Sequence, residues 1–144
     1  MIRSIRVSAM YVAMALLSLV GLVDALYLTI EHVTGQSVRC TIVSGCSEVL
    51  SSSYAVVAGI PLAAVGAAAY FTVFSLATLA IFGYRLAGKL LAPLTALMVL
   101  VSLWLIYLQA FVIRAFCQFC LLSAAITIIL FVIAFVAWKK GSLR

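Results

Sequence analysis

Four cysteines are the residues of this chain whose types and spacing are best suited to chemistry. Cys40 and Cys46 lie in one predicted loop, while Cys117 and Cys120 form a CxxC motif where the last apolar segment begins. Cysteine is suited to two-electron chemistry, and two pairs can pass a disulfide from one to the other. The pattern therefore predicts a dithiol relay held at the ends of membrane-embedded segments.

The elements that must position these cysteines are long apolar segments. The chain has 144 residues, of which 68% are hydrophobic and 8% charged, with a mean hydropathy of +1.38. A membrane-spanning helix needs about 20 mainly apolar residues. Four stretches qualify, at residues 7–30, 60–83, 90–113 and 116–138. We predict an all-α bundle of four transmembrane helices that forms a single domain over residues 1–144, with a retained first helix rather than a cleaved signal peptide.

Basic residues gather on one side of the predicted bundle. Seven of the nine Lys and Arg residues flank the two termini or lie in the connection 84–89. By the positive-inside rule this side is cytoplasmic, and so are both termini. The cysteines then lie on the outer side of the cell (inner) membrane, where disulfides persist. The net charge of +6 therefore marks topology and does not predict a nucleic-acid partner.

The CxxC motif falls at the predicted start of a helix. Cys117 and Cys120 are three residues apart, so both sulfur atoms face the same way there. The positive end of the helix dipole lowers the pKa of a nearby thiol, and Arg114 is expected to add to this effect. Before the second span, the apolar and polar residues of 47–54 fall on two different sides of a helix. This pattern favours a short amphipathic helix on the membrane surface, which would cover the outer end of the bundle.

Two other uses of the cysteines are compatible with the sequence. Four thiolates can form a closed zinc site, but the five residues between Cys40 and Cys46 exceed the usual spacing of zinc ligands, so we predict no metal. The same two cysteines can also form a purely structural disulfide, although so short a ring removes little chain entropy. Either use would make this a non-enzymatic membrane protein.

The electron acceptor of a relay in this chain is predicted to be lipid-soluble. The sequence has no haem ligand pair and no Gly-rich nucleotide motif. A quinone, menaquinone or ubiquinone, takes two electrons and two protons and needs an apolar slot with a few polar groups. Aromatic residues near the outer end are candidates to line it, namely Tyr54, Phe111, Phe116 and Phe119. Asp24, inside the first span, is a candidate to relay protons or to pair with Arg114.

Three segments closely resemble prokaryotic members of the vitamin K epoxide reductase family. They are LVDALYLTIEH at 22–32, GCSEVLSSSYAVVAGIPLAAVGAAAY at 45–70 and AFCQFC at 115–120. The resemblance implies a four-helix bundle around a quinone, with a half-helix at 47–53 capping the pocket. It also implies that Ser52 matches the serine that the family places near its active site.

The resemblance further implies a role for each cysteine. Cys40 would meet a separate thioredoxin-like (DsbA-like) exported protein, and Cys46 would hand over to Cys117. Cys120 would be the cysteine next to the quinone. The expected net effect is disulfide formation in exported proteins.

Departures from the family pattern limit what can be carried over. Vertebrate members have a tyrosine where this chain has Ala124, and an asparagine whose nearest match is Leu62. Those two contacts to the quinone are therefore missing, and we do not expect epoxide reduction. The sequence continues for six residues after Trp138, so we expect the thioredoxin-like partner to be a separate protein.

Disulfide-forming membrane proteins of the DsbB type are the alternative with the same chemistry. They also have four spans and two cysteine pairs, but their CxxC lies in the first outer loop. Here the CxxC comes second, at a helix start, and this order favours the vitamin K epoxide reductase family.

Overall fold

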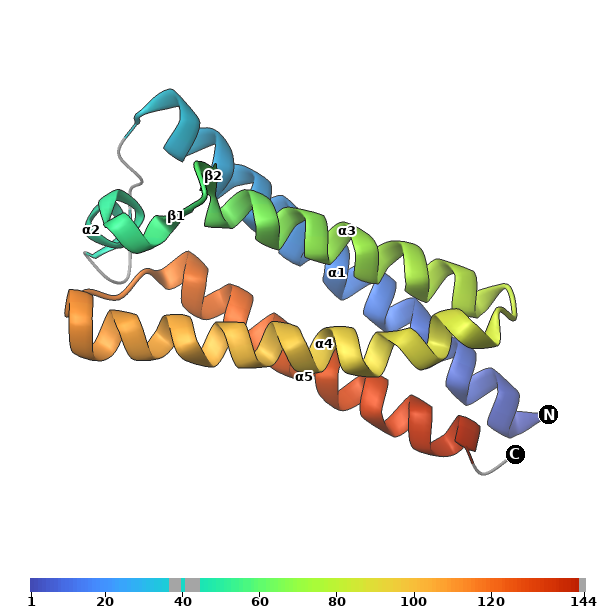
Figure 1. Ribbon diagram of the computed structural model, residues 1–144. Helices are drawn as coiled ribbons and strands as arrows, with labels where there is room; N and C mark the ends of the chain where they lie inside the picture. Colours follow the sequence, from blue (N-terminus) through green and yellow to red (C-terminus); the bar gives the residue numbers. More distant parts are fainter. Residues whose placement is uncertain (37–39, 41–44, 143–144) are drawn as a thin grey trace.

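The computed structural model describes residues 1–36, 40 and 45–142. In this part of the chain, four helices are long and apolar enough to cross a membrane (Figure 1). They are α1 (Ile2–Thr34), α3 (Leu62–Ile81), α4 (Arg85–Tyr107), which continues into the π-helical turn η2 (Leu108–Ile113), and α5 (Gln118–Ser142). The predicted all-α bundle with four membrane spans is confirmed.

The helices differ from the predicted spans at their ends. α1 runs on to Gly35, whose φ of 69° is the left-handed conformation that closes many helices. α3 begins at Leu62 rather than at residue 60, because Ile60–Pro61 form the short strand β2. α5 begins at Gln118 rather than at residue 116. Hydropathy locates the apolar stretch, whereas caps and turns decide where a helix ends.

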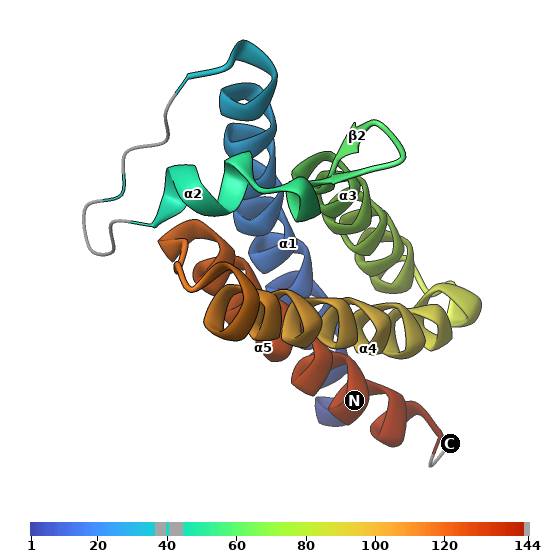
Figure 2. The ribbon, with the colours of Figure 1, turned by 60° about the vertical axis from the view of Figure 1, so that its left-hand side comes forward.

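The long helices form a ring in which each packs against two neighbours. α1 packs against α3 and α5, and α4 packs against the same two helices (Figures 1 and 2). In the inner half, where the chain termini lie, Met14, Leu91 and Leu130 are fully buried. Buried alanines from α3, α4 and α5 join them in one core. Small side chains let the backbones approach closely, which gives this half its tight packing.

Tyr70 on α3 is a buried member of this core that contacts both α1 and α5. Its ring lies over Gly21 on α1, where any side chain larger than hydrogen would overlap it. Its hydroxyl group lies 2.6 Å from Ser123 Oγ and 3.1 Å from Thr127 Oγ1, both on α5. One buried side chain on α3 thus ties three helices together midway along the bundle.

Short elements cross the end of the bundle that lies opposite the two termini, which we call the outer end (Figure 2). The helix α2 (Cys46–Ser51) leads into the 3-10 turn η1 (Ser53–Ala55), which is followed by strands β1 (Val56–Val57) and β2 (Ile60–Pro61). The two strands pair antiparallel through a turn in which both Ala58 and Gly59 have positive φ. The short amphipathic helix predicted at 47–54 is confirmed with shifted bounds, since α2 runs from Cys46 to Ser51.

The inner end of the bundle holds both termini and the connection between α3 and α4 (Figure 1). Gly83, with a φ of 96°, makes that connection tight. Arg3 donates a hydrogen bond to the carbonyl of Lys140 at 3.3 Å, so the first and last helices meet here. From this turn α3 and α4 diverge toward the outer end (Figures 1 and 2).

Candidate active site

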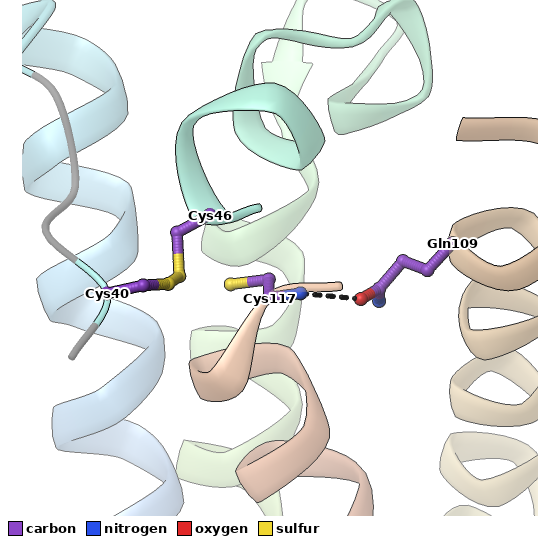
Figure 3. The surroundings of a disulfide bond; sticks show 4 residues. All are labelled: Cys40, Cys46, Gln109 and Cys117. Atoms are coloured by element: carbon purple, nitrogen blue, oxygen red, sulfur yellow. Dashed lines mark hydrogen bonds between the residues drawn. A yellow bond between two sulfur atoms is a disulfide. The ribbon is translucent and has the colours of Figure 1, made fainter. Parts of the chain in front are cut away.

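The first cysteine pair is joined as a disulfide. Cys40 and Cys46 have their Cα atoms 5.9 Å apart, a separation that suits the bond. Cys46 is the first residue of α2 and is almost fully buried. The side chain of Cys117 points toward this disulfide (Figure 3).

A glycine allows the two cysteine pairs to meet. A Cβ atom on Gly45 would lie 2.6 Å from the carbonyl oxygen and 2.7 Å from the nitrogen of Phe116. The chain before Cys46 therefore rests directly on the backbone before Cys117. Both cysteines are buried in one apolar cluster, which also includes Leu28 from α1.

The second pair consists of two free thiols at the start of α5. Cys117 lies just before the helix, outside the spanning segment, and its carbonyl accepts a hydrogen bond from Leu121 N–H at 3.0 Å. A hydrogen bond with the Cys120 thiol lowers the pKa of Cys117 from 9.0 to about 7. Burial raises this pKa, whereas hydrogen bonds with the backbone at Cys120 and Phe119 lower it further. The predicted helix-start activation thus has a geometric basis.

Arg114 does not take the part expected from the sequence. Its backbone is left-handed, with a φ of 56°, and its side chain is exposed. It is not among the groups that shift the pKa of Cys117. The hydrogen bond between the two thiols has the largest effect instead.

Gln109 is a buried polar residue that the sequence reasoning missed. It lies in η2, where its side-chain Oε1 accepts a hydrogen bond from the backbone N–H of Cys117 at 3.0 Å (Figure 3). Its own carbonyl accepts a second hydrogen bond from Ala115 N–H at 3.1 Å. Gln109 thereby fixes the link between α4 and α5. The available signal was a lone amide in an apolar segment, eight residues before the CxxC, where polar side chains are costly and commonly functional.

A cavity of about 270 Å³ adjoins this site. It is bounded by the four long helices together with α2, η1 and η2, and its walls are mostly apolar. The polar or ionisable residues that line it are Asp24, His32, Ser52, Tyr54, Tyr70, Ser102, Gln109, Cys120, Ser123 and Thr127. An apolar chamber with a few polar groups is typical of a site for a small hydrophobic molecule.

Asp24 lies on the wall of this cavity. Its side chain is 7% exposed, and within the described residues its Oδ2 has no hydrogen-bond partner. The sequence-based alternative that it pairs with Arg114 is wrong, because no ion pair joins these two described residues and Arg114 is exposed. An unpartnered carboxyl oxygen in an apolar chamber is energetically costly.

The predicted quinone contacts separate into two groups. Ser52 and Tyr54 line the cavity, and Ser52 Oγ donates a hydrogen bond to the carbonyl of Val49 at 2.7 Å. Three phenylalanines are not among the lining residues. Phe111 is 69% exposed with its ring 5.2 Å from that of Tyr107, Phe116 is 39% exposed, and Phe119 packs 5.3 Å from the ring of Tyr27. The sequence analysis named these three as candidates to line the slot, and they lie at the cysteine end of the bundle but not among the residues that line this cavity.

The family model for the vitamin K epoxide reductase family matches residues 12–135. The chain belongs to the vitamin K epoxide reductase family. The match covers most of the chain and includes all four cysteines, so the resemblance found in the sequence is confirmed. Membership in this family makes the chain a membrane thiol oxidoreductase, consistent with one disulfide and two free thiols at the end of four apolar helices.

Proposed function

We propose that this family member is a quinone-dependent thiol:disulfide oxidoreductase. It oxidises a separate thioredoxin-like exported protein, reduces a membrane quinone and so supports disulfide formation in exported proteins. One observation carries the proposal: the reduced CxxC lies between a disulfide on one side and an apolar cavity on the other, with Cys117 facing the disulfide and Cys120 lining the cavity.

The relay begins at the loop disulfide. A thiolate of the partner attacks Cys40, and the Cys40–Cys46 bond breaks with Cys46 as the leaving thiolate. The second partner thiol then attacks the mixed disulfide and releases Cys40, so the partner leaves oxidised. Cys46 next attacks Cys117 in a Cys117–Cys120 disulfide, and Cys40 resolves the resulting bond. This restores the loop disulfide and the two free thiols seen in the structure.

The quinone step removes the electrons from the membrane pair. The thiols of Cys117 and Cys120 lose two electrons and two protons, a disulfide forms between them, and the quinone leaves as hydroquinone. We assign Cys120 as the thiol next to the quinone because it lines the cavity, and Asp24 as a group that relays protons there. Ser52 and Tyr54 remain the predicted contacts to the quinone on the capping segment.

The cavity has a route to the lipid that suits a quinone with an isoprenoid tail. Its walls include Val65 on α3 and Leu97 and Val101 on α4, which are 49%, 58% and 43% exposed. α3 and α4 diverge from their inner turn (Figure 2), and these exposed side chains of the cavity wall mark where a quinone ring would enter while its tail stays among membrane lipids. We propose menaquinone or ubiquinone as the acceptor.

We propose that the cysteine end faces the outside of the cell membrane and both termini face the cytoplasm. The inner end combines the termini with the α3–α4 turn (Figure 1). Its basic residues are the signal that holds an end in the cytoplasm. In this orientation the Cys40–Cys46 disulfide faces the compartment of the exported partners. We also propose that residues 1–144 act as one domain.

Two alternatives are less well supported. A DsbB-type oxidase shares the chemistry, but its CxxC would be in the first outer loop. A non-enzymatic protein would hold all four cysteines in structural bonds or in a zinc site, yet Cys117 and Cys120 form no disulfide, while Cys40 and Cys46 are bonded to each other and offer no thiolate to a metal. Among residues 1–36, 40 and 45–142, no three His, Cys, Asp or Glu side chains gather as a metal site.

The deciding experiment is quinone reduction by the purified protein in detergent, with dithiothreitol or a reduced thioredoxin-like protein as donor. We expect Cys120→Ala to abolish turnover with either donor. Cys40→Ala should stop turnover with the protein donor and spare it with dithiothreitol, which reaches the CxxC directly. Full quinone reduction by Cys120→Ala would contradict the assignment. Stoichiometric zinc in the purified protein, or disulfides that never exchange, would favour the non-enzymatic alternative.

A further inference from the structure

The amide of Gln109 has one end fixed and one end uncommitted. Because the backbone N–H of Cys117 is a donor, the atom that meets it at 3.0 Å must be the side-chain oxygen, and this sets the orientation of the amide. The nitrogen, Nε2, carries two N–H donors and has no protein acceptor within the described residues. Gln109 is 3% exposed and lines the cavity, as Cys120 does.

Two hydroxyl groups of the cavity, those of Ser52 and Thr127, already donate to the protein. Ser52 donates to the carbonyl of Val49 at 2.7 Å, and Thr127 donates to the carbonyl of Ser123 at 2.8 Å. Each of these donors would have to give up a protein acceptor in order to bind a ligand.

Tyr70 is held in the same way, and few donors are left deep in the chamber. Its hydroxyl lies 2.9 Å from the carbonyl of Ser123. Ser102 on α4 has a hydroxyl with no partner among the described residues. The Nε2 of Gln109 is the uncommitted donor whose side chain also touches the reactive cysteine pair.

We propose that Gln109 recognises a carbonyl oxygen of the quinone, by donating a hydrogen bond from Nε2 while its Oε1 holds Cys117. This inference rests on the proposed function and names a binding residue for it. A quinone that leaves water must find donors for its carbonyl oxygens, or it loses their hydration without compensation. Gln109 supplies one such donor, and its amide is held in place by Cys117, next to where the quinone would react with the thiols.

The competing explanation is that Gln109 only braces the link 114–117. Two substitutions separate the roles. Gln109→Glu keeps an oxygen that can accept from Cys117 N–H, and its carboxylate has no donor once it is ionised, so binding is measured at a pH high enough to ionise it. Gln109→Leu removes both functions at similar volume. Gln36→Glu makes the same chemical change at an exposed outer residue and is the matched control.

The experiment measures binding of two ring compounds that differ only in their carbonyl groups. The probes are 2,3-dimethyl-1,4-naphthoquinone, whose blocked ring positions prevent thiol addition, and 2,3-dimethylnaphthalene. Calorimetry is done in a Cys120→Ala background, which retains the N–H of Cys117 but cannot complete the two-electron step. We expect Gln109→Glu and Gln109→Leu each to lower the preference for the quinone over the naphthalene about tenfold, as befits one lost hydrogen bond. Gln36→Glu should leave the preference unchanged.

The ratio of the two affinities, quinone over naphthalene, also remains informative if a variant distorts the cavity. Both probes then lose affinity together and the ratio does not change. A preference in Gln109→Glu equal to that of the parent protein would overturn the assignment and leave the proposed function in place. Failure of the unmodified protein to reduce any quinone would instead contradict the proposed function, and the binding preference would still decide the role of Gln109. A parallel rise in the KM for the quinone, with dithiothreitol as donor, is expected in an otherwise unmodified Gln109→Glu protein.

Discussion

The two ends of the bundle are built from the same four helices and differ in how they pack. At the inner end, alanines and fully buried leucines fill the space between helices joined by a tight turn. At the outer end α3 and α4 have diverged (Figure 2), and this end holds the cavity that all four long helices line together with α2, η1 and η2. The cysteines and the cavity belong to the outer end, so the inner end contributes geometry rather than chemistry. Substitutions at the two ends should therefore have separable effects.

The largest effect is expected at Asp24. Asp24→Asn keeps the size of the side chain but cannot accept a proton, and it should lower quinone turnover about 100-fold to 1,000-fold with dithiothreitol as donor. Stopped-flow absorbance of the quinone measures the rate. Glu48→Gln, an exposed change at the same end of the bundle, is the control. A normal rate in Asp24→Asn would remove Asp24 from the proton path.

Gly45→Ala should separate the two cysteine pairs without disturbing the cavity. The new methyl group would overlap the backbone of Phe116 and push Cys46 away from Cys117. We expect turnover with a protein donor to fall about 100-fold, because a displacement of this size misaligns attack on a disulfide. Turnover with dithiothreitol should persist. Gly141→Ala, which meets no neighbouring atom, is the matched control, and equal rates with both donors would show that the contact is unimportant.

Leu130→Ala tests the inner end. Leu130 is fully buried, so its truncation leaves a void and should lower the free energy of unfolding by about 2 kcal/mol. Unfolding in a denaturing detergent series measures this loss. The turnover number of the folded protein should stay unchanged. Leu100→Ala, at a residue 64% exposed to lipid, should lower neither quantity. A large loss of turnover in Leu130→Ala would show that the two ends are not independent.

The smallest effect concerns the charge state of Cys117. With Cys40 and Cys46 replaced by alanine, the thiolate absorbance of the CxxC pair should rise with a midpoint near pH 7, because the thiol hydrogen bond holds the pKa of Cys117 at about 7. A lowered pKa means that the thiolate is present at lower pH than usual. Further replacement of Cys120 by alanine should move the midpoint upward, toward the ordinary value of 9.0. An unmoved midpoint would show that the hydrogen bond is not the cause.

The sequence was sufficient to predict the bundle, the grouping of the cysteines and the short helix α2. Long apolar segments and charge asymmetry are strong signals because they reflect the bilayer as a solvent. The face on which a side chain lies was harder to predict. Phe111 is exposed whereas Gln109 lines the cavity, as residues two apart on a helix face opposite sides, and an aromatic near the outer end does not by itself reveal its face. The left-handed backbone of Arg114 has no clear sequence signal, and its side chain is exposed.

The π-helical turn η2 makes the site sensitive to chain length. A π turn contains more residues than an α turn, so deleting one codon between Ala110 and Ile113 would let the segment relax into regular α-helix. The link 114–117 would then begin one residue earlier, and Cys117 would lose its register with Gln109. Phe111 and Val112 are exposed, so other apolar residues at these two positions would keep the same contact with lipid. Natural variation at this place should therefore be free in residue identity and strict in the number of residues.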